Sequence, residues 1–146
     1  MALFPFGRTI HCTCGSRVGI EPRVRPAPGG REVRFAVDAM LGRLARWLRI
    51  MGCDAVYEPD IDDASLVRCA LEEQRVLLTR DRALPTEWRV PRVRVLSAEA
   101  PLDQLREVAR AFGLDWRARL FTRCNRCNAE LVSATPAEVE GCVPPR

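Results

Sequence analysis

Hydrophobic residues in the middle of the chain recur with two different periods. Residues 34–38 (Arg-Phe-Ala-Val-Asp) form a short apolar run that ends in a carboxylate. Four apolar residues then recur at helical spacing before Gly52, at Leu41, Leu44, Leu48 and Met51. A short apolar run predicts a buried strand, whereas recurrence at helical spacing predicts an amphipathic helix, which a glycine can end. We therefore expect a strand followed directly by a helix.

This alternation of strands and helices continues toward the C-terminus. The next expected strands lie at residues 55–57, 75–79 and 92–96, and the next expected helices at 65–74 and 101–113. Asp62 or Asp63 can cap the first of these helices, and the second has proline in its first turn and glycine at its end. Alternating strands and helices predict an α/β fold with a mostly parallel sheet that is covered on both faces.

The composition agrees with one catalytic domain plus a small appendage. The chain has 146 residues, of which 47% are hydrophobic, and this is enough for one buried core but not for two full domains. No stretch approaches the roughly 18 consecutive apolar residues of a membrane helix, and the N-terminus lacks the pattern of a signal peptide. We expect a soluble, cytoplasmic protein.

The charged residues narrow the function classes further. The net charge is +4, and all 23 basic residues are arginine. The absence of lysine excludes mechanisms with an obligatory lysine, which include the phosphate-binding P-loop, Schiff-base chemistry and phospho-aspartate receivers. The high arginine content has two interpretations. It can reflect a GC-rich genome, or it can serve contacts with phosphate and nucleic-acid backbones.

Carboxylates occur where the expected strands end. Asp38 ends the first strand, Asp81 follows the strand at 75–79, and an acidic run at 58–63 follows the second strand. The carboxyl ends of parallel strands meet at one edge of a sheet, where ligands bind. Carboxylates gathered there without lysine repel each other unless a hard divalent cation such as Mg²⁺ or Mn²⁺ binds between them. Such an ion can activate water for phosphodiester hydrolysis.

These aspartates also have simpler interpretations. One is that Asp62 or Asp63 only caps a helix and that Asp81 only begins a turn. Asp60 and Asp62 stay ambiguous because the run contains more carboxylates than a metal site needs. The coincidence of acidic residues at three strand ends favours the metal site.

Seven cysteines are present, and four of them form two close pairs. Cys12 and Cys14 lie near the N-terminus, and Cys124 and Cys127 lie near the C-terminus. Without a secretion signal, such pairs are typical of metal ligands rather than disulfides. Two further cysteines lie within apolar helical patterns and are interpreted as small core residues, Cys53 and Cys69.

Three segments together resemble a known family. They are residues 34–63 (RFAVDAMLGRLARWLRIMGCDAVYEPDIDD), 75–84 (RVLLTRDRAL) and 120–131 (LFTRCNRCNAEL). In order and spacing they are similar to the Mut-seven C-terminal ribonuclease domain, a PIN-like family, over about residues 34–146. The resemblance implies a PIN-like three-layer α/β/α sandwich followed by a zinc ribbon, and metal-dependent ribonuclease activity on RNA. It also implies that the metal-binding acidic residues are Asp38, Asp63 and Asp81.

The chain differs from this family in its zinc ribbon. Family members continue into a second C-x-x-C hairpin, whereas this chain ends before it. The N-terminal segment FGRTIHCTCGSRVGI, with glycine directly after its cysteine pair, resembles the missing hairpin. We expect a circularly permuted ribbon whose structural Zn²⁺ is held by four thiolates, from Cys12, Cys14, Cys124 and Cys127.

The N-terminal pair leaves alternatives open. Cys12 and Cys14 are separated by a single residue, which is tighter than the usual knuckle. His11 or Cys142 could therefore replace one of them, and two unrelated reduced pairs are a further alternative. The expected organisation is a ribbon half at 1–22, a Pro/Gly-rich linker at 23–32, the PIN-like core at 33–116 and the second ribbon half at 117–146.

Arginines lie beside the expected acidic edge. Two are on the first expected helix and two flank Asp81. We expect these four to bind the phosphates of the substrate: Arg43, Arg46, Arg80 and Arg82. Arg49 continues the spacing of the helix and is interpreted as part of its solvated face, and Trp47 as a core residue rather than a base-stacking platform.

Three functions stay open at this point. The leading hypothesis is an endoribonuclease that recognises RNA by backbone charge and single-strand accessibility. The alternatives are a non-catalytic RNA- or ribosome-binding zinc-ribbon adaptor and a metal-dependent phosphatase that acts on small esters. Loss of Asp38 would abolish the activity of a nuclease or a phosphatase and leave the function of an adaptor unchanged. Comparing activity on polymeric RNA with activity on small phosphate esters would then separate the two enzymes.

Overall fold

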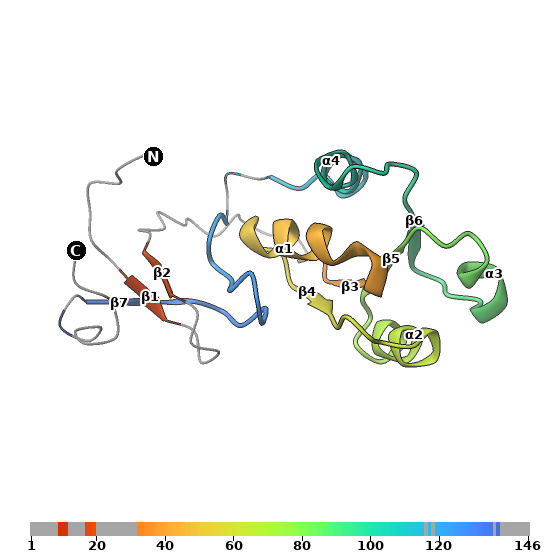
Figure 1. Ribbon diagram of the computed structural model, residues 1–146, viewed down its shortest axis with the longest axis horizontal. Helices are drawn as coiled ribbons and strands as arrows, with labels where there is room; N and C mark the ends of the chain where they lie inside the picture. Colours follow the sequence, from red (N-terminus) through yellow and green to blue (C-terminus); the bar gives the residue numbers. More distant parts are fainter. Residues whose placement is uncertain are drawn as a thin grey trace.

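The computed structural model describes residues 9–11, 17–19, 32–115, 117, 119–135 and 137, with main chain only in the first two ranges. These residues form one sheet of four strands and one of three. The four-stranded sheet and its helices form a layered sandwich, and the smaller sheet lies apart from it, beyond the loop that leads into β7 (Val132–Ala134) (Figure 1). No helix in the described ranges is long and apolar enough to cross a membrane.

The larger sheet is entirely parallel. Its strands are β3 (Phe35–Val37), β4 (Ala55–Tyr57), β5 (Val76–Thr79) and β6 (Val93–Val95), in the spatial order β4-β3-β5-β6. In the register, Val37 lies opposite Tyr57 of β4 and opposite Leu78 of β5. All four expected strands are therefore confirmed, and their carboxyl ends share one edge of the sheet.

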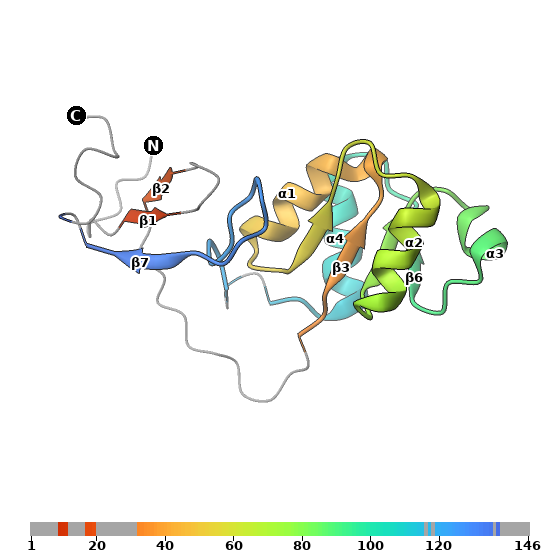
Figure 2. The same ribbon diagram turned by 90° about the horizontal axis from the view of Figure 1, so that it is seen from below.

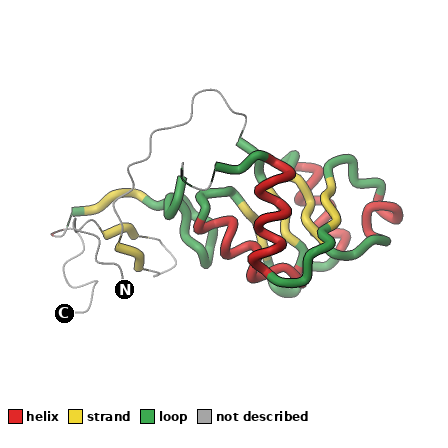
Figure 3. Tube along the Cα trace, turned by 90° about the horizontal axis from the view of Figure 1, so that it is seen from above, coloured by secondary structure: helices red, strands yellow, loops and turns green. Residues whose placement is uncertain are grey.

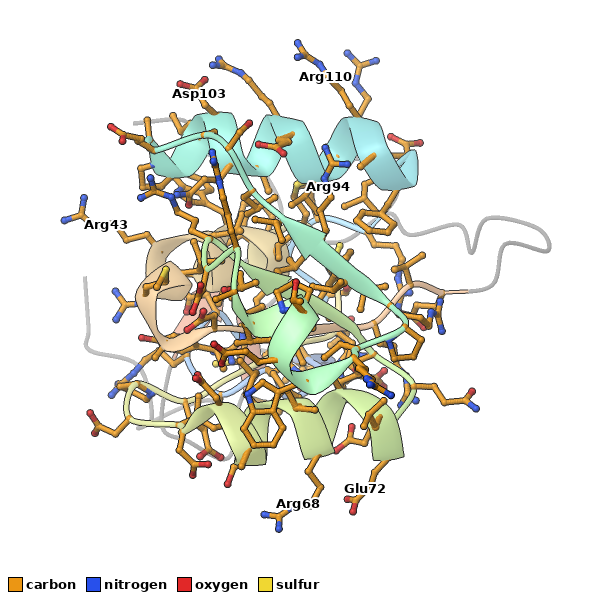
Figure 4. The ribbon with its side chains drawn as sticks, turned by 90° about the vertical axis from the view of Figure 1, so that its right-hand side faces the viewer. Arg43, Arg68, Glu72, Arg94, Asp103 and Arg110 are labelled. Atoms are coloured by element: carbon orange, nitrogen blue, oxygen red, sulfur yellow. The ribbon has the colours of Figure 1, made fainter. Side chains whose placement is uncertain are left out.

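Helices cover both faces of this sheet. They are the 3₁₀ helix η1 (Ala39–Leu41), α1 (Gly42–Ile50), α2 (Asp63–Glu72), α3 (Leu84–Trp88) and α4 (Pro101–Phe112). α1 packs against α4 and β4, whereas α2 packs against β3 and β5. Figure 4 shows the sheet between α4 and α2, with Arg110 pointing outward from α4 and Arg68 outward from α2. The expected α/β/α layering is confirmed.

Each face of the sheet has its own core. On the α1–α4 face, the strand residues Phe35, Val37, Val76 and Leu78 join Leu44, Leu48 and Val108. On the α2 face, Ala36 and Leu77 join Leu66, Val67 and Ala70. Burial on both faces explains why the strands read as continuous apolar runs rather than as an alternation. Each large apolar side chain buried in this way contributes about 1.5–3 kcal/mol to folding.

The helices and their ends follow the signals in the sequence, except for one short helix that the sequence does not predict. Asp62 caps α2, because its Oδ1 accepts a hydrogen bond from the Ser65 N–H at 2.9 Å. Gly113 ends α4 in the left-handed conformation, with φ of 61°. The exception is α3, which the pattern does not predict because its five residues are too few to show a helical period.

The three-stranded sheet joins the two ends of the chain. It contains β1 (Thr9–His11), β2 (Arg17–Gly19) and β7 (Val132–Ala134), all antiparallel, in the order β2-β1-β7. Figures 2 and 3 show this sheet separated from the sandwich by the loop that leads into β7. The sheet thus pairs strands from the N-terminal part of the chain with a strand from its C-terminal part.

The segment between α4 and β7 packs against the end of α1. The Phe121 N–H donates to the Ile50 carbonyl at 2.8 Å. Gly52 has a φ of +81°, and a Cβ at this position would lie 2.6 Å from the Thr122 Oγ1. Only glycine accepts both this conformation and this close approach. The glycine that ends the helix is therefore also the place where the C-terminal segment docks.

Two side chains of α1 differ from their expected positions. The spacing predicts Arg49 on the solvated face, but it is 3% exposed because main-chain carbonyls from elsewhere in the chain accept its hydrogen bonds. Trp47 is predicted in the core, but it is 39% exposed. The buried stripe of the helix runs through Leu44 and Leu48, and Trp47 lies outside that stripe. Both predictions are wrong.

Candidate active site

The acidic edge contains a hydrogen-bonded link between β3 and β5. Thr79, the last residue of β5, donates from Oγ1 to the Asp38 Oδ2 at 2.5 Å and accepts from the Asp81 N–H at 2.9 Å. The Asp38 N–H donates to the Leu78 carbonyl at 3.0 Å. The chain runs from β3 outward to β4 and then to β5 on the other side of β3, so the β3–β5 boundary is a topological switch point. Ligands of open parallel sheets bind at such points.

The main chain orients the carboxylates of both Asp38 and Asp81. Asp38 is 7% exposed, caps η1 and makes a long 3.5 Å contact with the Met40 N–H. Asp81 is half-buried, and its Oδ1 accepts from the Ala83 N–H at 2.8 Å. A carboxylate has about four lone-pair sites, so both groups keep acceptor capacity for a cation.

The acidic run after β4 divides into a cap and an available carboxylate. Hydrogen bonds from the Ser65 main chain and hydroxyl hold the pKa of Asp62 below its usual range. Asp63 is the exposed first residue of α2, and its carboxylate makes no hydrogen bond or ion pair with another residue of the described ranges. Asp62 is therefore the structural cap, and Asp63 keeps both carboxylate oxygens for other ligands.

The structure does not show an assembled metal site. Among the residues that it describes, no three His, Cys, Asp or Glu side chains lie close enough together to hold an ion. The link through Thr79 joins Asp38 with Asp81 and leaves Asp63 outside it. The chemistry of the donors, which are carboxylate oxygens from three segments at one sheet edge, is nevertheless that preferred by Mg²⁺ and Mn²⁺.

A groove of about 450 Å³ lies beside this edge, where Ala39 follows Asp38. Three of the four arginines that we expect to bind phosphate line it: Arg43, Arg46 and Arg80. Arg43 and Arg46 are exposed, and their side chains form no hydrogen bond or ion pair with another described residue. Figure 4 shows Arg43 projecting away from the body of the molecule. Arg82 is exposed and is not among the residues that line the groove.

Tyr57 and Gly42 shape one wall of the groove. The Tyr57 hydroxyl donates to the Ala39 carbonyl at 3.2 Å. A Cβ on Gly42 would lie 2.5 Å from the Tyr57 Oη, which is closer than atoms approach without displacement. Glycine at the start of α1 therefore allows the ring to tie β4 to the connection between β3 and α1.

The opposite wall is the loop between β6 and α4. Gln104 is 5% exposed and donates from Nε2 to the carbonyls of Ala98 at 3.2 Å and Glu99 at 3.0 Å. Glu107 accepts from the N–H groups of Ser97 at 3.1 Å and Ala98 at 3.2 Å. Desolvation acts to raise the pKa of Glu107, but these hydrogen bonds hold it below its usual range. The loop is thus fixed, and it presents Glu99 to Arg80 at 3.4 Å.

The C-terminal cysteine pair lies in a tight turn. Cys124 is buried and Cys127 is exposed. The Asn128 N–H donates to the Cys124 carbonyl at 2.9 Å, and the Cys124 N–H donates to the Ala129 carbonyl at 2.9 Å. Two sulfur donors at the ends of such a closed turn fit one half of a structural zinc site.

The other expected zinc ligands come from segments near the two termini. Cys12, Cys14 and Cys142 lie outside the described residues, and of His11 only the main chain is described. In the register, His11 lies opposite Val132, the residue of β7 that is nearest in sequence to the cysteine turn. The main chain of His11 therefore lies at the end of β7 that comes from this turn.

Four polar side chains join the cysteine turn to the sandwich, and we call them the anchor cluster: Arg49, Asp54, Arg75 and Asn128. Asn128 donates from Nδ2 to the Asp54 Oδ1 at 2.7 Å, and Arg75 donates to the same oxygen at 2.7 Å. Burial acts against ionisation of Asp54, but the hydrogen bonds from Arg75 and Asn128 outweigh it and hold its pKa below the usual range. Arg49 donates to carbonyls of the turn itself.

The two central cysteines take no part in either site. Cys53 packs against the α1–α4 core, and burial raises the pKa of its thiol to about 11. Cys69 is half-buried on α2, where burial also raises the pKa of its thiol. A neutral thiol is a poor metal ligand.

Comparison with known proteins shows the family. Residues 33–146 match the family model described as the Mut7-C RNAse domain. The chain belongs to this family. No curated protein and no solved structure matches it. The matched range includes the acidic edge, the groove and the cysteine turn, and the ribonuclease name of the family suggests RNA as the substrate class.

Five residues of the groove and the acidic edge are missing from the sequence predictions. They are Gly42, Tyr57, Glu99 and Gln104 in the groove and Thr79 at the acidic edge. Thr79 alone carries a usable signal, because a hydroxyl residue ends an otherwise apolar buried strand directly before the T-R-D-R turn. The others act through contacts between elements that are distant in sequence, so local pattern says nothing about them.

Proposed function

We propose that this protein is a metal-dependent ribonuclease that hydrolyses RNA phosphodiester bonds at the carboxyl edge of the β3–β5 boundary. The observation that carries the proposal is the juxtaposition of the Asp38–Thr79–Asp81 link with a groove that has three arginines. Acidic residues next to arginines, two of which have no side-chain partner among the described residues, suit a substrate that is a polyanion and a reaction that needs a cation.

The acidic residues have the role of metal ligands in this proposal. Asp38, Asp63 and Asp81 would hold Mg²⁺ or Mn²⁺, which when bound supplies Lewis-acid stabilisation of the phosphate and a more acidic water. Asp38 and Asp81 are fixed by the Thr79 hydroxyl and by main-chain N–H groups. Asp63 stands on the first turn of α2, where the helix dipole favours a negative charge.

The arginines have the role of substrate binding. Arg43 and Arg46 offer charges that no described residue neutralises, and they would bind phosphates of a strand lying in the groove. Arg80 and Arg82 flank Asp81, so they would meet the phosphates nearest the reaction. These contacts read backbone charge and no base identity.

The cysteines have a structural role in the proposal. Cys124 and Cys127 would hold Zn²⁺ together with Cys12 and Cys14 in a circularly permuted ribbon, a pairing that the hydrogen bonds between β1 and β7 support. Deletion of residues 1–30 would then remove two ligands. Metal analysis by mass spectrometry should find one tightly bound zinc in the intact protein and markedly less in the truncated one, whereas equal content would place Cys142 or a second chain in the site.

The function itself is tested with labelled RNA. Purified protein with Mn²⁺ should cleave a structured RNA that has single-stranded loops, and EDTA should abolish the cleavage. A small phosphate ester supplied in parallel separates a nuclease from a phosphatase. RNA binding without any cleavage, unaffected by EDTA, would favour the non-catalytic adaptor instead.

A further inference from the structure

Arg49 makes an unusual contact between the sandwich and the cysteine turn. Its Nε donates to the Ala55 carbonyl at 2.8 Å, and its Nη1 donates to the Arg126 carbonyl at 2.6 Å and to the Asn125 carbonyl at 3.3 Å. The side chain is 3% exposed. A buried guanidinium needs such acceptors, because it has lost its hydration. Its partners Asn125 and Arg126 are the two residues between the cysteines.

Asn128 makes a second contact at the same place. Its Oδ1 accepts from the Ala55 N–H at 3.0 Å, and its Nδ2 donates to Asp54. The residue has a φ of 68°, a conformation that asparagine tolerates better than most residues. Ala55 thus uses both its N–H and, through Arg49, its carbonyl to hold the cysteine turn. Since Ala55 is the first residue of β4, the turn is bonded to the start of that strand.

Two elements therefore connect the turn to the groove. Helix α1 has Arg49 at the turn and Arg43 and Arg46 in the groove. Strand β4 has Ala55 at the turn and Tyr57 in the groove. A helix rises about 1.5 Å per residue, so Arg43 and Arg49 are only about 9 Å apart along the axis. A displacement at one end of either short element therefore moves the residues at its other end.

We propose that Arg49 is a positioning residue that couples the cysteine turn to the groove, so that zinc bound at Cys124 and Cys127 orders helix α1 and strand β4. The inference rests on the zinc site proposed above, and it extends the proposed function by naming how that site controls the RNA-binding groove. Metal at the turn fixes the carbonyls of Asn125 and Arg126, which Arg49 binds. Structural metal binding contributes directly to the folding free energy of the segment that holds it.

The experiment measures hydrogen exchange in the full chain with and without zinc. Protein stripped with a chelator and dialysed receives Mg²⁺ in all samples, and one equivalent of zinc in half of them. Zinc should slow exchange in residues 42–50 and 55–57 by about 10-fold or more, in addition to the turn at 123–130. No RNA is present, so the test can succeed in a protein that cleaves nothing, and the proposed activity can fail independently.

Two arginine variants form a matched pair. Arg49→Lys keeps the charge but lacks the planar fork that binds Ala55 and Arg126 together. In this variant zinc should still protect residues 123–130, but its effect on α1 should fall below about 2-fold. Arg126→Ala removes an exposed side chain of the turn and keeps the carbonyl that Arg49 binds, so it should behave as the unaltered protein does.

Exchange in α2, on the opposite face of the sheet, reports whether Arg49→Lys is folded. Should that variant unfold, Asn128→Ala provides the second test, with zinc protection of residues 55–57 expected to disappear. The proposal is overturned if zinc binds nowhere in the stripped protein, if it protects only residues 123–130 in the unaltered chain, or if Arg49→Lys retains the full effect on α1.

Discussion

The two ends of helix α1 carry the same residue type in opposite environments. At the first turns, Arg43 and Arg46 are exposed and line the groove. At the last turn, Arg49 is 3% exposed and donates to the carbonyls of Ala55 and Arg126. The three arginines follow one another at one spacing, so neither residue type nor periodicity separates them. They differ in their surroundings. The groove end of the helix is exposed to solvent, whereas carbonyl oxygens from other segments surround the last turn.

This difference separates the residues that govern the reaction from those that govern stability. An exposed guanidinium keeps its hydration, contributes little to folding and stays available for a phosphate. A buried one needs its acceptors, and removing one partner leaves an uncompensated charge. We therefore expect variants at the groove end to change cleavage and binding, and variants in the anchor cluster to change stability first.

The largest effect is expected at the acidic edge. Asp38→Asn preserves the shape of the side chain but removes the charge of a proposed metal ligand, so the cleavage rate should fall at least about 100-fold with little change in unfolding. Asp63→Asn and Asp81→Asn should behave in the same way, whereas the exposed Asp60→Asn should cleave almost normally. Near-normal cleavage by Asp38→Asn would show that this edge is not the active site.

The next effect is expected in the anchor cluster. Asp54→Asn leaves Arg75 with the more exposed Glu73 as its remaining anionic partner, which should lower the free energy of unfolding by about 2 kcal/mol in urea titrations at neutral pH. The exposed pair of Asp103 and Arg106 provides the control, because Asp103→Asn should change stability by less than about 1 kcal/mol. Equal effects of the two variants would contradict the structural role of Asp54.

The pH dependence of stability provides a second test of the Asp54→Asn variant. The folded pKa of Asp54 lies below its unfolded value, so its contribution to stability is full above the unfolded pKa and is lost as the pH falls toward the folded pKa. The stability difference between the unaltered chain and Asp54→Asn should therefore shrink from about pH 4 downward. A difference that stayed constant over this range would show that the charge of Asp54 is not involved.

A smaller effect is expected from the groove arginines. The double variant Arg43→Ala/Arg46→Ala should weaken binding of single-stranded RNA about 10-fold and reduce the slope of log K against log salt by about 1.4, because each neutralised phosphate contributes about 0.7. Arg68→Ala/Arg110→Ala removes the same charge from the outward positions labelled in Figure 4. Similar losses in the two doubles would indicate that net charge, and not the groove, binds RNA.

The smallest effect is expected at Glu99. Its ion pair with Arg80 is largely exposed, with 87% of the Glu99 side chain accessible, so it contributes little energy. Glu99→Gln frees Arg80 for phosphate and should strengthen RNA binding by no more than about 3-fold in a filter-binding or anisotropy titration. Weaker binding would show that Glu99 supports the groove rather than competing for Arg80.

The sequence by itself determined the order and type of most elements. The strands β3 to β6 and the helices α1, α2 and α4 follow from apolar runs, helical spacing and terminal residues such as Asp62 and Gly113, because these signals act within a few neighbouring positions. The motifs also indicated the family, which the match over residues 33–146 confirms. Asp38 and Asp81 at strand ends predict the acidic edge in the same local way, because the carboxyl ends of parallel strands lie together.

Only the tertiary structure decided which polar residues have partners. Arg49 and Arg43 are indistinguishable along the helix, and the burial of Arg49 depends on Arg126, far away in sequence. Hydrogen bonds and burial arise between segments that the chain brings together late, and a local pattern holds no information about a partner more than about a turn away.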